Sequence, residues 1–213
     1  MSALYEIFLE IIKKGRGDEV ASSLGLSKHG NKTIELLSAT KTEDCHKIRK
    51  EASPGSKLER LATARVQQIL FYNCQEAATV NQCRSIHDDP FSDEETKLEA
   101  FKRMISFMSL PKIRKEIAEG VYSNSHVYQY LAIERHEEMI LVLLSYADSV
   151  QECMELFKQA FKKSTKKRMF KKAMVLADDN ILDFWKILNY CDSHSEYSYA
   201  CIKKMASLEK KTT

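Results

Sequence analysis

The distribution of glycine and proline constrains the fold of this chain more than any other feature of its sequence. All six glycines lie at or before Gly120 and the last of the three prolines is Pro111, so the final 93 residues contain neither residue type. Glycine and proline are the strongest local interruptions of regular secondary structure. A stretch of this length without them is typical of one helix following another. The chain also lacks the Asn-Gly and Asp-Gly dipeptides that close tight β-hairpins.

Candidate helix starts recur along the chain as capping boxes. In this motif a Ser or Thr side chain and a Glu three residues later each accept a hydrogen bond from the other's backbone N–H. We therefore predict an all-α protein of about ten helices stacked in pairs, as a helical repeat or an irregular α-bundle. The five candidate boxes are Thr40/Glu43, Ser56/Glu59, Ser92/Glu95, Ser149/Glu152 and Ser193/Glu196. Helix breaks are predicted near residues 15–18, 25–31, 53–56, 88–92, 109–111, 120–125, 148–149, 164–165, 178–180 and 192–193.

The amino-terminal stretch predicts a helix over residues 1–14 rather than a signal peptide. Its apolar residues recur at helical spacing and are interrupted by Glu6 and Glu10. No apolar run approaches the ~20 residues that span a bilayer. The six cysteines include no C-x-x-C pair, and most lie in apolar helical stretches, as reduced cysteines do. These features predict a cytoplasmic protein without a transmembrane segment, and they leave open export without an amino-terminal signal.

The length of 213 residues allows one large domain or two small ones. The Ser53-Pro54-Gly55-Ser56 turn marks the best internal boundary. We predict a helical subdomain over residues 1–53 and a helical-repeat-like domain over residues 54–213. One continuous domain over residues 1–213 is the alternative, because a segment of this size is short for an independent core.

Two carboxy-terminal segments share a pattern. Each contains the end of a helix, a polar turn (134–136, then 178–180) and an apolar helix that ends in Tyr-x-Asp, with a period of about 45 residues. The segment 125–148, and more faintly 173–192, resembles the helix–turn–helix half of an ankyrin repeat, although Arg135 stands where the turn glycine belongs. The resemblance implies a degenerate helical repeat that binds proteins rather than catalysing a reaction.

Positive charge is concentrated in one segment. Eight lysines and arginines lie between Lys158 and Lys172, and the net charge of +3 for the whole chain leaves −5 for the remainder. With a turn at residues 164–165, the next three cations would stand in the first turn of a helix. There they would oppose the helix macrodipole at a cost of roughly 0.3–1 kcal/mol each, which a bound anion would remove. The alternative interpretation is a solvated amphipathic helix, which the apolar residues of the segment favour.

The composition of this segment discriminates among anionic partners. Its cations are mostly lysines, which attract phosphate without reading bases, so sequence-specific nucleic-acid binding is not expected. Binding of phosphate, of an anionic lipid or of nucleic acid without sequence preference stays as an alternative. Stable membrane anchoring usually requires a second signal besides one basic segment. The preferred partner is therefore another protein with an acidic surface.

The sequence offers no complete metal or catalytic site. His87-Asp88-Asp89 with Cys83 gathers possible ligands, but a turn followed by a capped helix explains the same residues. Cys191, His194 and Cys201 supply fewer than the four ligands of a structural zinc site. We predict no catalytic residue, no metal ligand and no cofactor. An enzyme whose helical active site escapes these motifs stays as an alternative.

The leading prediction is a non-enzymatic protein-interaction module, which would be an adaptor, a regulator or a secreted effector. It would bind its partner through the basic helical surface and neighbouring tyrosines, since tyrosine is favoured at interfaces. Two tyrosines occupy equivalent positions in the two similar segments. The predicted binding residues are Lys162, Lys163, Lys166, Lys167, Arg168, Lys171, Lys172, Tyr146 and Tyr190.

Overall fold

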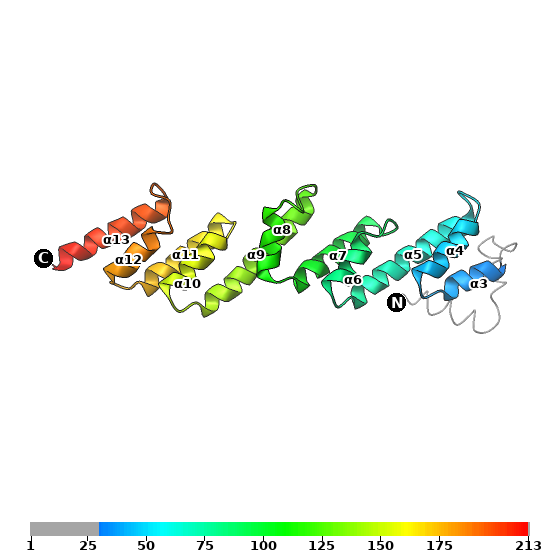
Figure 1. Ribbon diagram of the computed structural model, residues 1–213, viewed down its shortest axis with the longest axis horizontal. Coiled ribbons are helices and arrows are strands. Elements are labelled where there is room, and N and C mark those ends of the chain that lie inside the picture. Colours follow the sequence, from blue (N-terminus) through cyan, green and yellow to red (C-terminus); the bar gives the residue numbers. More distant parts are fainter. Residues whose placement is uncertain (1–29, 213) are drawn as a thin grey trace. The chain divides into compact units, whose positions relative to one another are not determined.

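The computed structural model describes residues 30–212, and these fold into eleven helices without any strand (Figure 1). The all-α prediction is confirmed. The predicted helix over residues 1–14, the break at 15–18 and most of the break at 25–31 lie outside the described residues. The helices are α3 (Gly30–Ser38), α4 (Thr42–Glu51), α5 (Lys57–Glu76), α6 (Val80–His87), α7 (Glu94–Phe107), α8 (Leu110–Ala118), α9 (His126–Tyr146), α10 (Val150–Gln159), α11 (Lys163–Leu176), α12 (Ile181–Leu188) and α13 (Glu196–Thr212).

Consecutive helices pack in pairs, as predicted. α4 lies against α5, α6 against α7, α8 against α9, α10 against α11 and α12 against α13. Helical spacing of apolar residues provides the buried face of each helix. In α10, for example, Val150, Cys153, Met154 and Phe157 are buried at successive steps of three, one and three residues.

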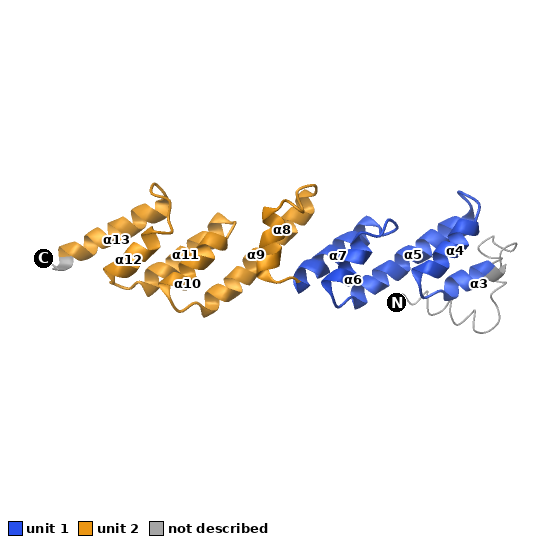
Figure 2. Ribbon diagram, in the orientation of Figure 1, with its two compact units in different colours: residues 1–107 blue, residues 108–213 orange. Residues whose placement is uncertain are grey.

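The described helices belong to two compact units (Figure 2). Unit 1 ends at Phe107 and contains α3 to α7, and unit 2 begins at Met108 and contains α8 to α13. The boundary predicted between residues 53 and 54 falls within unit 1. The turn there joins α4 to α5, which pack against each other as a pair.

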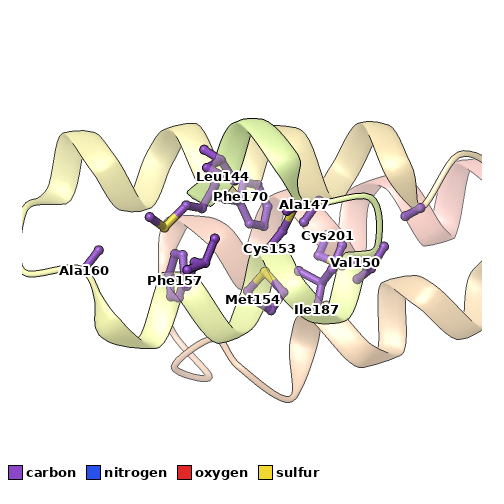
Figure 3. Packing of buried hydrophobic residues seen from close by; sticks show 14 of the residues in the cluster. Leu144, Ala147, Val150, Cys153, Met154, Phe157, Ala160, Phe170, Ile187 and Cys201 are labelled. Atoms are coloured by element: carbon purple, nitrogen blue, oxygen red, sulfur yellow. The ribbon is translucent and has the colours of Figure 1, made fainter. Parts of the chain in front are cut away.

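A buried apolar cluster holds unit 2 together (Figure 3). It draws side chains from all six helices of the unit, among them Met154 of α10, Phe170 of α11 and Ile187 of α12. Burying an apolar side chain of this size stabilises a fold by about 1.5–3 kcal/mol. The cluster therefore fixes the apolar face of α11, whose opposite face carries part of the basic segment.

Two blocks of four helices, α4–α7 in unit 1 and α8–α11 in unit 2, match each other helix by helix. The long helices α5 and α9 have 20 and 21 residues, and α7 and α11 have 14 residues each. The junctions match as well, because Ala77 and Ala147 end the long helices and Thr79 and Ser149 cap the helices that follow. Corresponding residues lie about 70 positions apart, which differs from the period of about 45 predicted from the sequence.

The first helices of the two blocks share an identical pentapeptide. Lys-Ile-Arg-Lys-Glu occupies residues 47–51 in α4 and residues 112–116 in α8. Its isoleucine is buried in both helices, as Ile48 and Ile113. The short helix α12 does not contain the pentapeptide, but it also buries an isoleucine, Ile187. The isoleucine anchors each of these short helices, whereas the charged residues around it lie nearer the surface.

Two of the five predicted capping boxes begin a helix where expected. The side chain of Ser56 caps α5, and Ser149 with Glu152 forms the complete reciprocal box of α10. The other three predictions are wrong by one or two residues, because a different residue precedes the helix. These residues are Lys41 before α4, Asp93 before α7 and Ser195 before α13.

The turn predicted at residues 134–136 is wrong, because α9 continues without interruption from His126 to Tyr146. Its polar residues are accommodated within the helix. Arg135 pairs with Glu138 at 3.3 Å, and the side chain of His136 is buried. The turn predicted at 178–180 is confirmed, since residues 177–180 separate α11 from α12. Polarity did not mark a turn at residues 134–136, because Arg135 pairs with Glu138 within the helix and Glu137 accepts a hydrogen bond from Phe161.

Candidate functional site

The turn before α11 lies at residues 160–162 and not at 164–165 as predicted. Its position depends on α9, because the Glu137 carboxylate accepts a hydrogen bond of 2.7 Å from the Phe161 backbone N–H. α11 then begins at Lys163. The macrodipole acts most strongly on the first positions of a helix, here residues 163–165. Residues 166–168 follow these positions. The predicted conflict between these three cations and the helix dipole is therefore wrong.

Lys162, at the N-cap of α11, is held by the long helix α9. Its ammonium group donates a hydrogen bond to the Glu134 carboxylate and lies 5.4 Å from the ring centre of Tyr130. This hydrogen bond lowers the pKa of Glu134 and raises the pKa of Lys162. A hydrogen bond to Glu134 also raises the pKa of Tyr130. Lys162 thus serves mainly to fix the turn.

Two further cations of the segment have partners within unit 2. Lys163 pairs with Glu196 of α13 at 3.1 Å. Lys166 lies over the ring of Phe157, 5.5 Å from its centre. Lys163 remains largely exposed, so its ion pair contributes little to stability.

Lys172 acts as a cap on α9. Its ammonium group donates hydrogen bonds to the backbone carbonyl oxygens of Leu144 and Ser145, at 2.6 and 3.3 Å. A cation is favourable at this end of a helix, where carbonyl oxygens lack partners within the helix. Unit 1 contains the same arrangement, since Arg103 of α7 donates to the Ala77 carbonyl oxygen at the end of α5 at 2.6 Å.

Tyr190 is also engaged within unit 2. Its hydroxyl accepts a hydrogen bond of 2.6 Å from the Gln151 side-chain amide. The ammonium group of Lys158 lies 4.2 Å from the centre of its ring. Tyr190 therefore joins the turn after α12 to α10, and it is only partly exposed.

Three cations remain on the exposed face of α11, and we call them the basic ridge: Lys167, Arg168 and Lys171. All three are exposed, and no ion pair is found for them among residues 30–212. Lys171 lies four positions after Lys167 and three after Arg168, so it neighbours both of them on the helix surface. The corresponding positions in α7 of unit 1 include Glu99 and Lys102, which pair with each other at 3.5 Å. The same helix face is thus internally neutralised in unit 1 and cationic in unit 2.

An open cavity of about 350 Å³ adjoins the basic ridge. Two leucines of α9 supply its apolar wall, and Tyr146, at the end of α9, is 76% exposed. The cavity is lined by Leu141, Leu144, Ser145, Arg168, Lys171 and Lys172. Sequence reasoning identified the cations and Tyr146 but missed both leucines. They belong to a continuous apolar run of α9, and only the packing of α11 shows which of its residues border a cavity.

A buried polar pair lies beneath the turn at residues 160–162. The ring of His136 packs against the ring of Phe161 at a centre-to-centre distance of 4.8 Å. The Nδ1 atom of His136 lies 3.5 Å from the Glu137 carboxylate, and in the described part of the chain neither ring nitrogen has a hydrogen-bond partner. Burial lowers the pKa of His136. The imidazole is therefore neutral near pH 7.

Five of the six cysteines are buried, and Cys191 is half-buried. Burial raises the pKa of all six thiols, to about 11 for Cys191 and Cys201. Such thiols are protonated at neutral pH, whereas the thiolate is the nucleophile and the metal ligand. The Cys201 thiol donates to the backbone carbonyl oxygen of Phe184 at 3.3 Å. Within residues 30–212, no group of three or more His, Cys, Asp or Glu side chains is arranged to hold a metal ion.

No family model, curated protein or solved structure matches this chain significantly. In the described region, none of the helices combines the length and the apolar character that crossing a bilayer requires. Inferences about function therefore depend on the basic ridge, its cavity and the matching of the two helix blocks.

Proposed function

We propose that this chain is a non-enzymatic protein-interaction module, acting as an adaptor or regulator, and that unit 2 binds an acidic segment of another protein. The basic ridge, the adjoining cavity and Tyr146 form the contact surface. The observation that carries this proposal is the position of three cations, unpaired among the described residues, next to a cavity with a leucine wall at the end of α9, where Tyr146 is exposed. Carboxylates of the partner would pair with the ridge, where Arg168 offers a bidentate geometry. An apolar side chain of the partner would enter between Leu141 and Leu144.

The comparison of the two helix blocks supports a role for the ridge in binding. A cation that caps the preceding long helix is present in both blocks, as Arg103 and as Lys172, so this feature belongs to the fold. The ridge positions differ, because Glu99 and Lys102 neutralise each other in unit 1. Unit 1 therefore has the same arrangement of helices without unpaired cations at the ridge positions. Uncompensated charges of this kind cluster at functional sites.

A helical-repeat organisation is part of the same proposal. The matched helix lengths, the matched junctions and the shared pentapeptide support it. Repeats of paired helices commonly present extended binding surfaces. The ankyrin-like resemblance stays a prediction for residues 173–192, where α11, a short turn and α12 make a helix–turn–helix.

The test is quantitative capture of partners from cells of the native host, followed by mass spectrometry. It compares the wild-type chain with a ridge variant, Lys167→Glu/Arg168→Glu/Lys171→Glu. The matched control, Lys112→Glu/Lys203→Glu/Lys210→Glu, changes three exposed lysines of unit 2 and alters the net charge equally. We expect partners that the control retains and the ridge variant loses. Their recovery should fall with added salt, because the contact is charged.

Two outcomes would contradict the proposal. One is capture that the ridge variant and the control reduce equally, which would indicate a general effect of charge. The other is binding of the ridge to phosphatidylserine vesicles with no protein recovered, which would establish the anionic-lipid alternative instead. Three ridge cations provide few phosphate contacts, whereas nonspecific nucleic-acid binding usually depends on many.

A further inference from the structure

Unit 1 contains a larger cavity, of about 890 Å³, between α5 and the beginning of α7. Its volume is in the range of about 300–1,000 Å³ that is typical of ligand sites. One continuous face of α5 forms the longer wall, through Ala64, Gln67, Gln68, Phe71, Tyr72 and Gln75. They follow one another at alternating steps of three and one residues, which is the pattern of one side of a helix. Asp93, Glu95 and Thr96 form the facing wall.

In its described residues, unit 1 lacks an ion pair that joins the matching helices of unit 2. In unit 2 the positions that correspond to Ala64 and Asp93 are occupied by Glu134 and Lys162. These two side chains form an ion pair across the matching helices α9 and α11. The small side chain of Ala64 cannot make such a bridge, so no ion pair joins α5 to the start of α7 at this position.

Side-chain amides and aromatic rings dominate the longer wall. Gln67, Asn73 and Gln75 line the cavity, and no hydrogen bond of their amide groups is found in the described part of the chain. Each amide offers both donors and an acceptor. Phe71 and Tyr72 are 36% and 47% exposed, which is high for aromatic side chains. The wall thus combines free hydrogen-bonding groups with apolar surface.

Two carboxylates, of Asp93 and Glu95, and one guanidinium, of Arg65, line the cavity, so the net charge of its lining is negative. The guanidinium of Arg65 is occupied, since it donates to the Ala39 carbonyl oxygen at 2.7 Å and to Gln68 at 3.2 Å. Asp93 accepts a hydrogen bond from the Thr96 backbone N–H at 2.7 Å and remains exposed. Glu95 is exposed as well, and residues 30–212 provide no ion pair for it. Anionic ligands are therefore disfavoured and cationic groups are favoured.

We propose that this cavity binds an extended peptide segment that carries a Lys or Arg side chain and an apolar side chain. An extended chain exposes its backbone N–H and C=O groups, which the amides of α5 can pair, whereas a helical ligand satisfies these groups itself. The cationic side chain lies against Asp93 and Glu95, and the apolar side chain against Phe71 and Tyr72. From residue 64 to residue 75 the face of α5 is about 17 Å long, which matches about five residues of extended peptide.

The probe is a phage-displayed library of random peptides of about nine residues, selected against the full chain. We expect the selected sequences to be enriched in Lys or Arg together with an aromatic or aliphatic residue. A synthetic copy of the most enriched peptide is then titrated by fluorescence anisotropy. Glu95→Lys should weaken its binding by about tenfold or more, because it places a cation against the bound cation.

Glu94→Lys is the matched control. Glu94 stands in the same first turn of α7 and carries the same charge, but it does not line the cavity. This variant should bind the peptide within about twofold of the wild type. A second variant, Ala64→Glu/Asp93→Lys, introduces the ion pair that joins the matching helices in unit 2, and it should abolish binding because it places a side-chain bridge across the cavity. Circular dichroism should show that each variant keeps its helical content.

Selection of no peptide above background, or selection of acidic peptides, would overturn the proposal. Equal losses in Glu95→Lys and Glu94→Lys would overturn it as well, because they would place the peptide outside the cavity. The result is independent of the proposed function of unit 2. The ridge variant Lys167→Glu/Arg168→Glu/Lys171→Glu should bind the selected peptide with unchanged affinity.

Discussion

Two adjacent lysines of α11 are predicted to have separable roles, one in stability and one in binding. Lys172 caps the carbonyl oxygens of Leu144 and Ser145, whereas Lys171 belongs to the exposed basic ridge. Replacing either residue with Met removes the charge and keeps most of the aliphatic stem. Lys172→Met should therefore weaken the fold, and Lys171→Met should weaken only the binding of an acidic partner.

The expected size of the stability effect follows from the contacts of Lys172. A hydrogen bond to a charged group contributes about 1.5–3 kcal/mol when buried, and a cation at a helix carboxyl end contributes about 0.3–1 kcal/mol when exposed. Lys172 is half-buried, and water can replace it at the carbonyl oxygens, so we expect a loss of about 1 kcal/mol. The corresponding fall in Tm is about 4 °C for a unit of this size. Lys171→Met should change the free energy of unfolding by less than about 0.5 kcal/mol.

The assay is urea and thermal unfolding followed by circular dichroism, with Arg103→Met as a second capping variant in unit 1. Arg103→Met should behave like Lys172→Met, because Arg103 donates to the end of α5 in the same way. A Lys172→Met variant as stable as the wild type would refute the capping role of Lys172. A Lys171→Met variant that is destabilised to the same extent would refute the separation of the two roles, because the ridge would then be part of the packing.

Three further predictions concern stability. His136 is buried with its pKa lowered by burial, so the unfolded chain binds a proton more readily than the folded chain. The contribution of neutral His136 to the free energy of unfolding should be fully present above the pKa of the unfolded chain, which is about 6.5. At lower pH the free energy of unfolding should decrease by up to about 1.4 kcal/mol per pH unit, until the pH reaches the pKa of His136 in the folded chain. Urea unfolding between pH 7.5 and 5 should show a smaller pH dependence for His136→Leu than for the wild type. An equal pH dependence of the two chains would exclude His136 as its origin. Ser149→Ala should lower the free energy of unfolding by about 1 kcal/mol, because it removes the complete capping box of α10. Ser193→Ala should leave the free energy of unfolding nearly unchanged, because Ser193 lies outside the observed cap of α13. The reverse order of the two effects would be inconsistent with the observed helix starts. Ile113→Ala should cost about 2–5 kcal/mol in urea unfolding, because Ile113 is fully buried, and a loss below about 1 kcal/mol would mean that α8 is not anchored by it.

The helical class and the paired packing could be predicted from the sequence because their causes are local. The absence of glycine and proline after Gly120 and the capping box at Ser149 act within a few residues. The position of the turn before α11 could not be predicted in this way. It depends on Glu134 and Glu137 of α9, which contact Lys162 and Phe161 across 28 and 24 positions of the chain.

The separation of the basic segment into structural and exposed cations has the same origin. Lys172 is indistinguishable from Lys171 by residue type, and only the approach of α9 places carbonyl oxygens next to Lys172. The matching of the two helix blocks, in contrast, has a signal in the sequence. The identical pentapeptides at 47–51 and 112–116, which lie 65 positions apart, could have indicated it, whereas the comparison of two carboxy-terminal segments led to a shorter period.

The most direct test of the binding proposal is lysine footprinting of unit 2 by acylation and mass spectrometry. The reactivity of individual lysines is measured in the isolated chain and in the complex with the captured partner. Lys167 and Lys171 should lose reactivity in the complex, while Lys112 and Lys203 should keep theirs. Unchanged labelling of Lys167 and Lys171 in a saturated complex would contradict it.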